Sequence, residues 1–130
     1  MEKIAIHTEQ APKAIGTYSQ AIQAHGFVYL SAQAPLHPQT MTVVEGGIEN
    51  EIRQVFDNLE AVAQGAGGSL NSFVKLTVYL TDLANFPLVN QVMEQRFSAP
   101  FPARAVIGVV ALPRATQVAI EGIMALPHGN

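Results

Sequence analysis

The fold is decided by one stretch, FVKLTVYLT at residues 73–81, which lies between two segments of helical pattern. Its apolar residues alternate with more polar ones: Val74, Leu76, Val78 and Leu80 against Lys75, Thr77 and Tyr79. A period of two is typical of a β-strand that buries one face. We therefore expect a strand over residues 73–81, with the rest of the fold arranged around it.

Helical patterns flank this strand on both sides. In residues 48–64 an apolar side chain recurs at alternating steps of four and three, namely Ile48, Ile52, Val55, Leu59 and Val62. Residues 87–97 carry a second stripe, which consists of Phe86, Val89, Met93 and Phe97, with Asn85 as the expected N-cap. Each helix is predicted to pack one apolar face on a sheet, and Asn90 is expected on the side of its helix opposite Phe86.

Further strands are expected at residues 3–7, 18–24, 27–32, 104–110 and 117–125, with His25-Gly26 as a two-residue hairpin turn. The predicted order is therefore βββαβαββ. A chain of 130 residues fits one domain, spanning residues 1–130. Two helices on one face of a mixed sheet are the natural arrangement for this order, which places the chain in the α+β class.

The composition narrows the possible functions. Apolar residues make up 48% of the chain and charged residues 13%, about half the usual charged share. A small domain cannot bury so much apolar surface alone, so we expect an oligomer. The net charge of −3 and the lack of a basic block disfavour nucleic acid. Without a signal-peptide pattern or a long apolar run, we expect a soluble cytoplasmic protein and no membrane contact.

Two charged residues stand out because their predicted strands are otherwise almost entirely apolar. Arg104 shares one side of its strand with Val106 and Gly108, and Glu121 shares its face with Ala119 and Ile123. A charge in such a place needs a partner or a wet pocket. Either Arg104 and Glu121 pair with each other, or Arg104 clamps a carboxylate while a partly buried Glu121 moves protons. The pattern alone leaves both alternatives open.

Other candidate residues carry weaker signals. Tyr18 and Ser19 follow Gly16 at the entry to a strand, and Ser31 ends a strand on the face of Phe27 and Tyr29. The four histidines, His7, His25, His37 and His128, show no metal-ligand spacing, so we predict no metal site. Cysteine is absent, which excludes disulfides and thiol chemistry.

Taken together, several short motifs resemble those of one known family. GTYSQA at residues 16–21 is similar to its Gly-Pro-Tyr-Ser-Gln-Ala motif, and SAQAP at residues 31–35 is similar to its Ser-Gly-Gln-x-Pro motif. Residues 74–82 resemble its central strand, and FPAR at 101–104 with IEGI at 120–123 resemble its C-terminal signature. The chain is thereby identified as resembling the RidA/YjgF family of reactive intermediate imine deaminases.

The resemblance implies a chorismate-mutase-like α+β domain that forms a homotrimer with its sites between subunits. It also implies a reaction without a cofactor: water attacks C2 of a 2-imino acid, such as 2-iminobutanoate or 2-iminopropanoate, and gives a 2-oxo acid and ammonia. These imines arise from enamines such as 2-aminoacrylate, which pyridoxal-phosphate enzymes release.

The resemblance also suggests roles for individual residues. Arg104 matches an arginine that clamps the substrate carboxylate, and Glu121 matches a glutamate that positions water and carries its proton. Tyr18 and Ser31 match pocket residues. Asn90 matches a polar position near the site, and backbone groups of Ala105 and Val106 are expected to face the ligand.

The chain departs from the family pattern at three positions. Thr17 replaces a proline, Ala32 replaces a glycine, and Val106 stands where some active members carry cysteine. These departures keep two rival readings open. One is a trimeric binder or sensor of small carboxylates without turnover, and the other, disfavoured by the acidic charge, is a role on RNA.

Overall fold

The computed structural model describes residues 2–126. Its strands are β1 (Ile4–Ile6), β2 (Ala21–Ala24), β3 (Phe27–Gln33), β4 (Phe73–Leu80), β5 (Ala103–Gly108) and β6 (Val118–Ala125). Its helices are α1 (Ile48–Gly65) and α2 (Phe86–Arg96), and short 3-10 turns lie at η1 (Leu70–Ser72), η2 (Leu83–Asn85) and η3 (Pro113–Ala115). The predicted order of strands and helices is confirmed.

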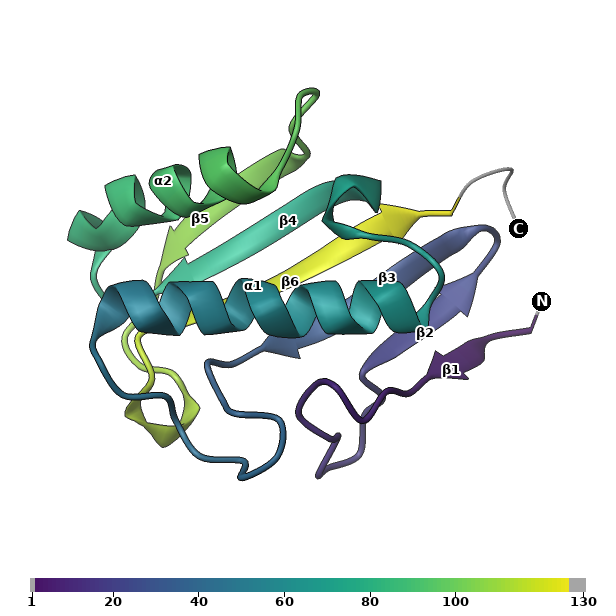
Figure 1. The fold of residues 1–130 in the computed structure, drawn as a ribbon, viewed down its shortest axis with the longest axis horizontal. Helices are drawn as coiled ribbons and strands as arrows, with labels where there is room; N and C mark the ends of the chain where they lie inside the picture. Colours follow the sequence, from purple (N-terminus) through teal and green to yellow (C-terminus); the bar gives the residue numbers. More distant parts are fainter. Residues whose placement is uncertain (1, 127–130) are drawn as a thin grey trace.

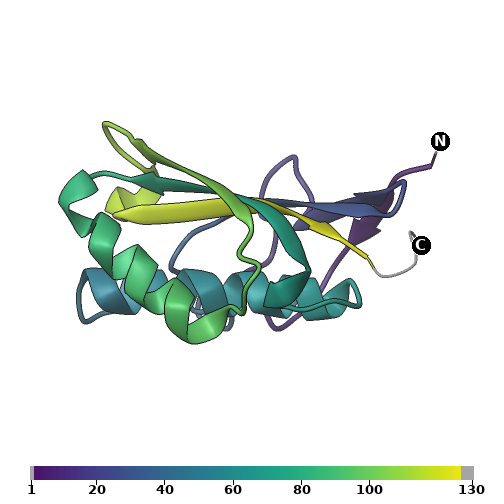
Figure 2. The same cartoon turned by 90° about the horizontal axis from the view of Figure 1, so that it is seen from above.

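The six strands form one sheet in the order β1-β2-β3-β6-β4-β5. All neighbours are antiparallel except β4 and β5, which run parallel because α2 carries the chain back between them. Both helices cover the same face of the sheet, as the two views show (Figures 1 and 2). This is the α+β arrangement expected from the sequence, and it leaves the other face of the sheet open.

The core lies between α1 and the central strands. The stripe predicted for α1 is almost wholly inside, since Ile52, Val55, Leu59 and Val62 are fully buried. Arg96 of α2 joins the two helices by ion pairs to Asp57 and Glu60 of α1, at 2.7 and 2.8 Å. The two helices therefore form one layer, in which these ion pairs tie the end of α2 to α1.

Two details of the expected strands are wrong. Residues 18–20 are not part of β2, because Gln20 turns into the interior and binds backbone groups there. In β4 the alternation fails at its start, where the register shifts between Phe73 and Lys75. Phe73 is buried as a result, and Val74 is exposed.

The start of α2 also differs from the expectation. Asn85 precedes the helix but its side chain makes no capping bond. The preceding turn η2 is capped by Asp82, whose carboxylate accepts a hydrogen bond from the backbone N–H of Ala84 at 2.9 Å. Over residues 2–126, neither helix combines the length and the apolar character needed to cross a bilayer.

Candidate functional site

Arg104 lies on the edge strand β5, on the face that carries the helices. Its register partner on β4 is the buried Leu76, and Val106 pairs in the same way with Val78. Parallel strands place register partners on one face of the sheet, so Arg104 and Val106 both point toward α2. The Arg104 guanidinium therefore lies beside α2 instead of in bulk solvent.

The guanidinium of Arg104 is held by three residues of α2. Its Nη1 donates to Oδ1 of Asn90 at 2.7 Å and lies 3.4 Å from the Met93 sulfur. Its central carbon lies 5.1 Å from the ring centre of Phe86, a cation–π contact. The prediction that Asn90 faces away from Phe86 is therefore wrong, because residues four apart share one face of a helix.

These contacts leave part of the guanidinium available. Arginine has five N–H donors, of which Nη1 supplies two. Both Nη1 donors are directed at Asn90 and Met93, while Nε and Nη2 have no hydrogen-bond acceptor within residues 2–126. The Nε–Nη2 edge is the side-on fork that binds a carboxylate with two parallel hydrogen bonds. Arg104 is therefore oriented but not neutralised.

Two hollows share Arg104 in their lining. One, of about 370 Å³, is lined by Asn90, Met93, Glu94, Phe101, Pro102 and Arg104. The other, of about 400 Å³, is lined by Leu83, Phe86, Val106 and Arg104. A small molecule in either hollow can therefore contact the arginine.

Glu121 lies on the opposite face of the sheet from Arg104. Its neighbour Gly122 is level with Leu76 and Arg104 across the sheet, and adjacent residues of a strand point to opposite faces. An Arg104–Glu121 pair within one chain is therefore excluded. The expectation that Glu121 is partly buried is also wrong, because the helices leave its face uncovered and the residue is exposed.

The carboxylate of Glu121 has one partner on the open face. Its Oε1 accepts a hydrogen bond from the Tyr79 hydroxyl at 2.8 Å. This hydrogen bond, with smaller contributions from desolvation and from the negative charge, raises the pKa of Tyr79 above its ordinary value. Tyr79 thus stays a donor and fixes the carboxylate, a role that no sequence pattern indicated.

Ser31 lies on the open face, and Tyr18 lies in the segment that leads into β2. The Ser31 hydroxyl donates to the backbone carbonyl of Ser19 at 2.6 Å, and the backbone N–H of Ser31 donates to the carbonyl of Gln20 at 3.0 Å. Ser31 follows Leu30, the register partner of Gly122, so it lies close to Glu121 on the neighbouring strand. Tyr18 is 52% exposed.

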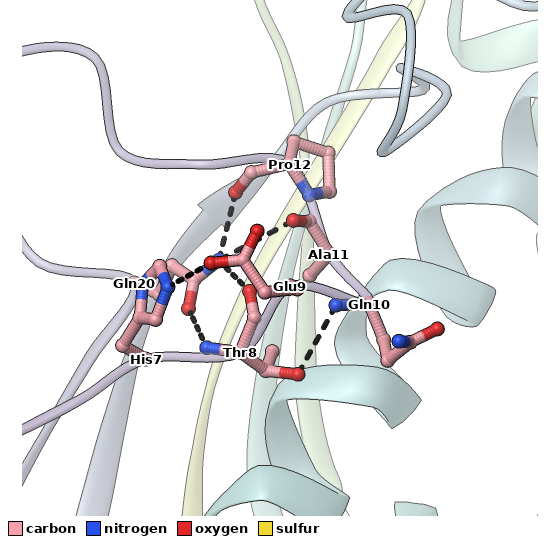
Figure 3. A network of polar contacts seen from close by, with 7 residues as sticks. All are labelled: His7, Thr8, Glu9, Gln10, Ala11, Pro12 and Gln20. Carbon is pink, nitrogen blue, oxygen red and sulfur yellow. Dashed lines mark hydrogen bonds and ion pairs between the residues drawn. The ribbon is translucent and has the colours of Figure 1, made fainter.

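Gln20 organises the loop that precedes Tyr18 (Figure 3). Its side-chain oxygen accepts from the N–H of Thr8 at 2.7 Å, and its amide nitrogen donates to the carbonyls of Thr8 and Pro12 at 3.0 and 2.9 Å. The residue is 2% exposed. Sequence reasoning missed this function, although Gln20 is part of the motif that it singled out.

The expected site residues therefore form two groups within one chain. Arg104, Val106 and Asn90 gather at β5 on the helix face, while Ser31 and Glu121 lie on the open face and Tyr18 lies exposed in the segment before β2. Three strand steps separate β3 from β5, which is about 14 Å at about 4.8 Å per step. One small ligand cannot touch both groups of the same chain.

The remaining expected positions are placed as follows. The side chain of Ala105 points to the open face, and its strand β5 pairs only with β4, so one side of its backbone lacks a strand partner within the described sheet. Thr17 and Ala32 are exposed. Within residues 2–126 no three His, Asp or Glu side chains come together as metal ligands, and His128 lies outside the described residues.

A family model described as "Endoribonuclease L-PSP" matches residues 8–126. The chain belongs to this family, which is the RidA/YjgF family.

Relatives and solved structures agree with this assignment. The chain is 42% identical over 118 residues to a mouse 2-iminobutanoate/2-iminopropanoate deaminase, covering 91% of this chain and 87% of the mouse protein. The crystal structure of RidA from an Antarctic Psychrobacter is 45% identical, with a TM-score of 0.91 and coverage of 95% and 99%. Escherichia coli TdcF with bound serine is 32% identical, with a TM-score of 0.86 and coverage of 94% and 98%. Other relatives, including one from Pyrococcus horikoshii, are named only RutC family proteins.

Proposed function

We propose that this protein hydrolyses reactive 2-imino acids to 2-oxo acids and ammonia, with Arg104 holding the substrate carboxylate. The observation that carries the proposal is the state of Arg104. Its Nη1 donors are directed at α2, and its Nε–Nη2 edge has no protein acceptor in the described residues. A small planar carboxylate fits that edge, and the 2-imino acid named in the mouse relative is such a molecule.

In the proposed reaction, water adds to C2 of the imine and ammonia leaves from the tetrahedral carbon. Both protons of the water must reach the nitrogen: one is transferred as water adds to the C=N bond, and the second leaves the new C2 hydroxyl as the C–N bond breaks and ammonia departs. We assign these transfers to Glu121, whose Oε1 is held by Tyr79 and whose exposed carboxylate leaves Oε2 for the attacking water. No step requires a metal or an organic cofactor. The cytoplasm remains the proposed location.

Because Arg104 and Glu121 lie on opposite faces of one chain, we propose that the complete site forms between subunits of a homotrimer. The open face carries exposed apolar side chains that a neighbouring copy would cover, among them Phe27, Tyr29 and Ile107. In this arrangement the β5 edge of one copy meets the Tyr18, Ser31 and Glu121 region of the next. The number of copies follows from the family resemblance.

The test couples a threonine dehydratase to the protein and follows 2-oxobutanoate while semicarbazide competes for the imine. The wild-type protein is expected to accelerate 2-oxobutanoate release, whereas Arg104→Ala is expected to lose most of this acceleration. No acceleration by the wild type would refute the enzyme proposal, and equal acceleration by both proteins would refute the role of Arg104 in it. The oligomer is tested by light scattering after size-exclusion chromatography, where a monomer at micromolar concentration contradicts the inter-subunit site.

The same experiment separates the rival functions. A protein that binds 2-oxobutanoate through Arg104 but does not change the rate is a binder or sensor of small carboxylates. If the purified protein degrades an RNA substrate and the Arg104→Ala variant does not, a role on RNA would be favoured. We place imine hydrolysis first, because the Arg104 guanidinium is held in one orientation and its free edge matches a single carboxylate group.

A further inference from the structure

Tyr79 and Glu121 lie on the neighbouring strands β4 and β6, on the open face of the sheet. The register pairs Glu121 with Thr77 and Tyr79 with Ala119, so the first and third of these side chains are diagonal neighbours on one face. An aromatic side chain can span such a diagonal, and the Tyr79 hydroxyl donates to Oε1 of Glu121 at 2.8 Å. The contact joins two paired strands of one chain, so it needs no neighbouring copy to form.

Within residues 2–126, the Tyr79 hydroxyl is the one group that donates a hydrogen bond to the Glu121 carboxylate. Ser31 lies close by on β3, but its hydroxyl donates to the backbone carbonyl of Ser19 at 2.6 Å. Lys75 lies further along β4 on the same face, and in this part of the chain it forms no ion pair with Glu121. The orientation of the carboxylate therefore depends on Tyr79.

The hydrogen bond makes the two oxygens of Glu121 unequal. Oε1 is held, whereas Oε2 has no hydrogen-bond partner among the described residues. The same bond is the largest of the causes that raise the pKa of Tyr79, so the hydroxyl stays protonated and remains a donor at neutral pH. A glutamate side chain otherwise turns about its single bonds, whereas a proton acceptor must lie within hydrogen-bond reach of the water. Holding one oxygen therefore places the other.

We propose that Tyr79 is a positioning residue for the hydrolysis: its hydroxyl holds Oε1 of Glu121 so that Oε2 meets the attacking water. Oε2 takes one proton from the water as its oxygen adds to C2, and delivers that proton to the nitrogen. It then takes the proton of the new C2 hydroxyl and delivers it to the nitrogen as the C–N bond breaks. Tyr79 keeps its own proton throughout and acts only through Glu121. This inference rests on the proposed function, since it requires Glu121 to carry the protons.

The test is Tyr79→Phe, which removes the hydroxyl and leaves the ring. We expect kcat to fall about tenfold in the semicarbazide competition with 2-iminobutanoate, because a misplaced base slows proton transfer. KM and the dissociation constant of 2-oxobutanoate should stay within about twofold of the wild type, since Arg104 still holds the carboxylate. The value of kcat is expressed per site that binds 2-oxobutanoate in calorimetry, so a loss of folded or assembled protein does not lower it.

A double variant shows whether Tyr79 acts through Glu121. In the Glu121→Gln background, adding Tyr79→Phe should change kcat by less than about twofold, because no carboxylate remains to be placed. Tyr29→Phe is the matched control, since it removes the same atom from the same open face. Tyr29 is 47% exposed on β3, its hydroxyl has no hydrogen-bond partner within the described residues, and the variant should leave kcat unchanged.

The possible results separate this role from the reaction itself. The positioning role is overturned if kcat per site is unchanged in Tyr79→Phe, if the loss appears in KM instead, or if the Glu121→Gln background shows an equal loss. Hydrolysis by Arg104 and Glu121 would stand in each of these cases. If the wild type does not accelerate 2-oxobutanoate release, the proposed function fails and the role of Tyr79 fails with it.

Discussion

Replacing Asn90 by alanine tests whether this residue acts through Arg104. The structure shows one charge-assisted hydrogen bond between them, at 2.7 Å. Such bonds contribute about 1.5–3 kcal/mol, and because Arg104 is only partly buried the lower end applies. About 1.5 kcal/mol corresponds to a fall of roughly tenfold in kcat/KM for the imine. The loss is expected mainly in KM, since a misdirected guanidinium binds the carboxylate less well.

A double-mutant cycle makes this prediction decisive. Arg104→Ala alone is expected to lower kcat/KM by about 100-fold or more, because it removes a bidentate ion pair. Adding Asn90→Ala to it should change the rate less than twofold, since the residue that Asn90 orients is gone. The assay is the semicarbazide competition with 2-iminobutanoate, and 2-oxobutanoate binding serves as a second measurement.

The control is Gln91→Ala, an exposed residue next to Asn90 on the same helix. It should leave both kcat/KM and binding within twofold of the wild type. The reasoning is refuted if Asn90→Ala costs tenfold in the Arg104→Ala background too, because Asn90 would then act on the substrate itself. It is equally refuted if Asn90→Ala alone has no effect.

Three further predictions concern the rest of the fold. Glu121→Gln should lower the pKa of Tyr79 toward its ordinary value, and a phenolate absorbance titration of both proteins measures this shift. The stabilisation that the hydrogen bond gives is present below the ordinary pKa and is lost as pH rises through the raised pKa, which urea unfolding at a series of pH values measures. Gln20→Ala should lower the free energy of unfolding by about 2–4 kcal/mol, because it leaves several backbone groups of the loop unpaired, and a urea midpoint unchanged from wild type would contradict this. Leu59→Ala should cost about 2–5 kcal/mol in the same experiment, run at one protein concentration, since Leu59 is fully buried; a loss below 1 kcal/mol would argue against its place in the core.

The parts of the site that the sequence indicated were single residues, not their arrangement. Arg104 stood out because its strand was otherwise apolar, and the structure places it partly buried beside α2. An Arg104–Glu121 pair was one of two open alternatives; the structure excludes it within one chain and shows Asn90 as the acceptor. Sequence spacing could not settle this, because it depends on which strands are neighbours and which face each residue takes.

Periodicity determined the helices and strands of this protein, since alternation and helical stripes reflect which side of each element is buried. Residues 73–81 indicated the central strand in this way, although its first residues shift register at Phe73. Tertiary structure alone decided that β6 lies between β3 and β4, which puts Glu121 on one face and Arg104 on the other. The physical reason is that strand order arises from long-range pairing between segments, and a local pattern carries no record of which segment becomes the neighbour.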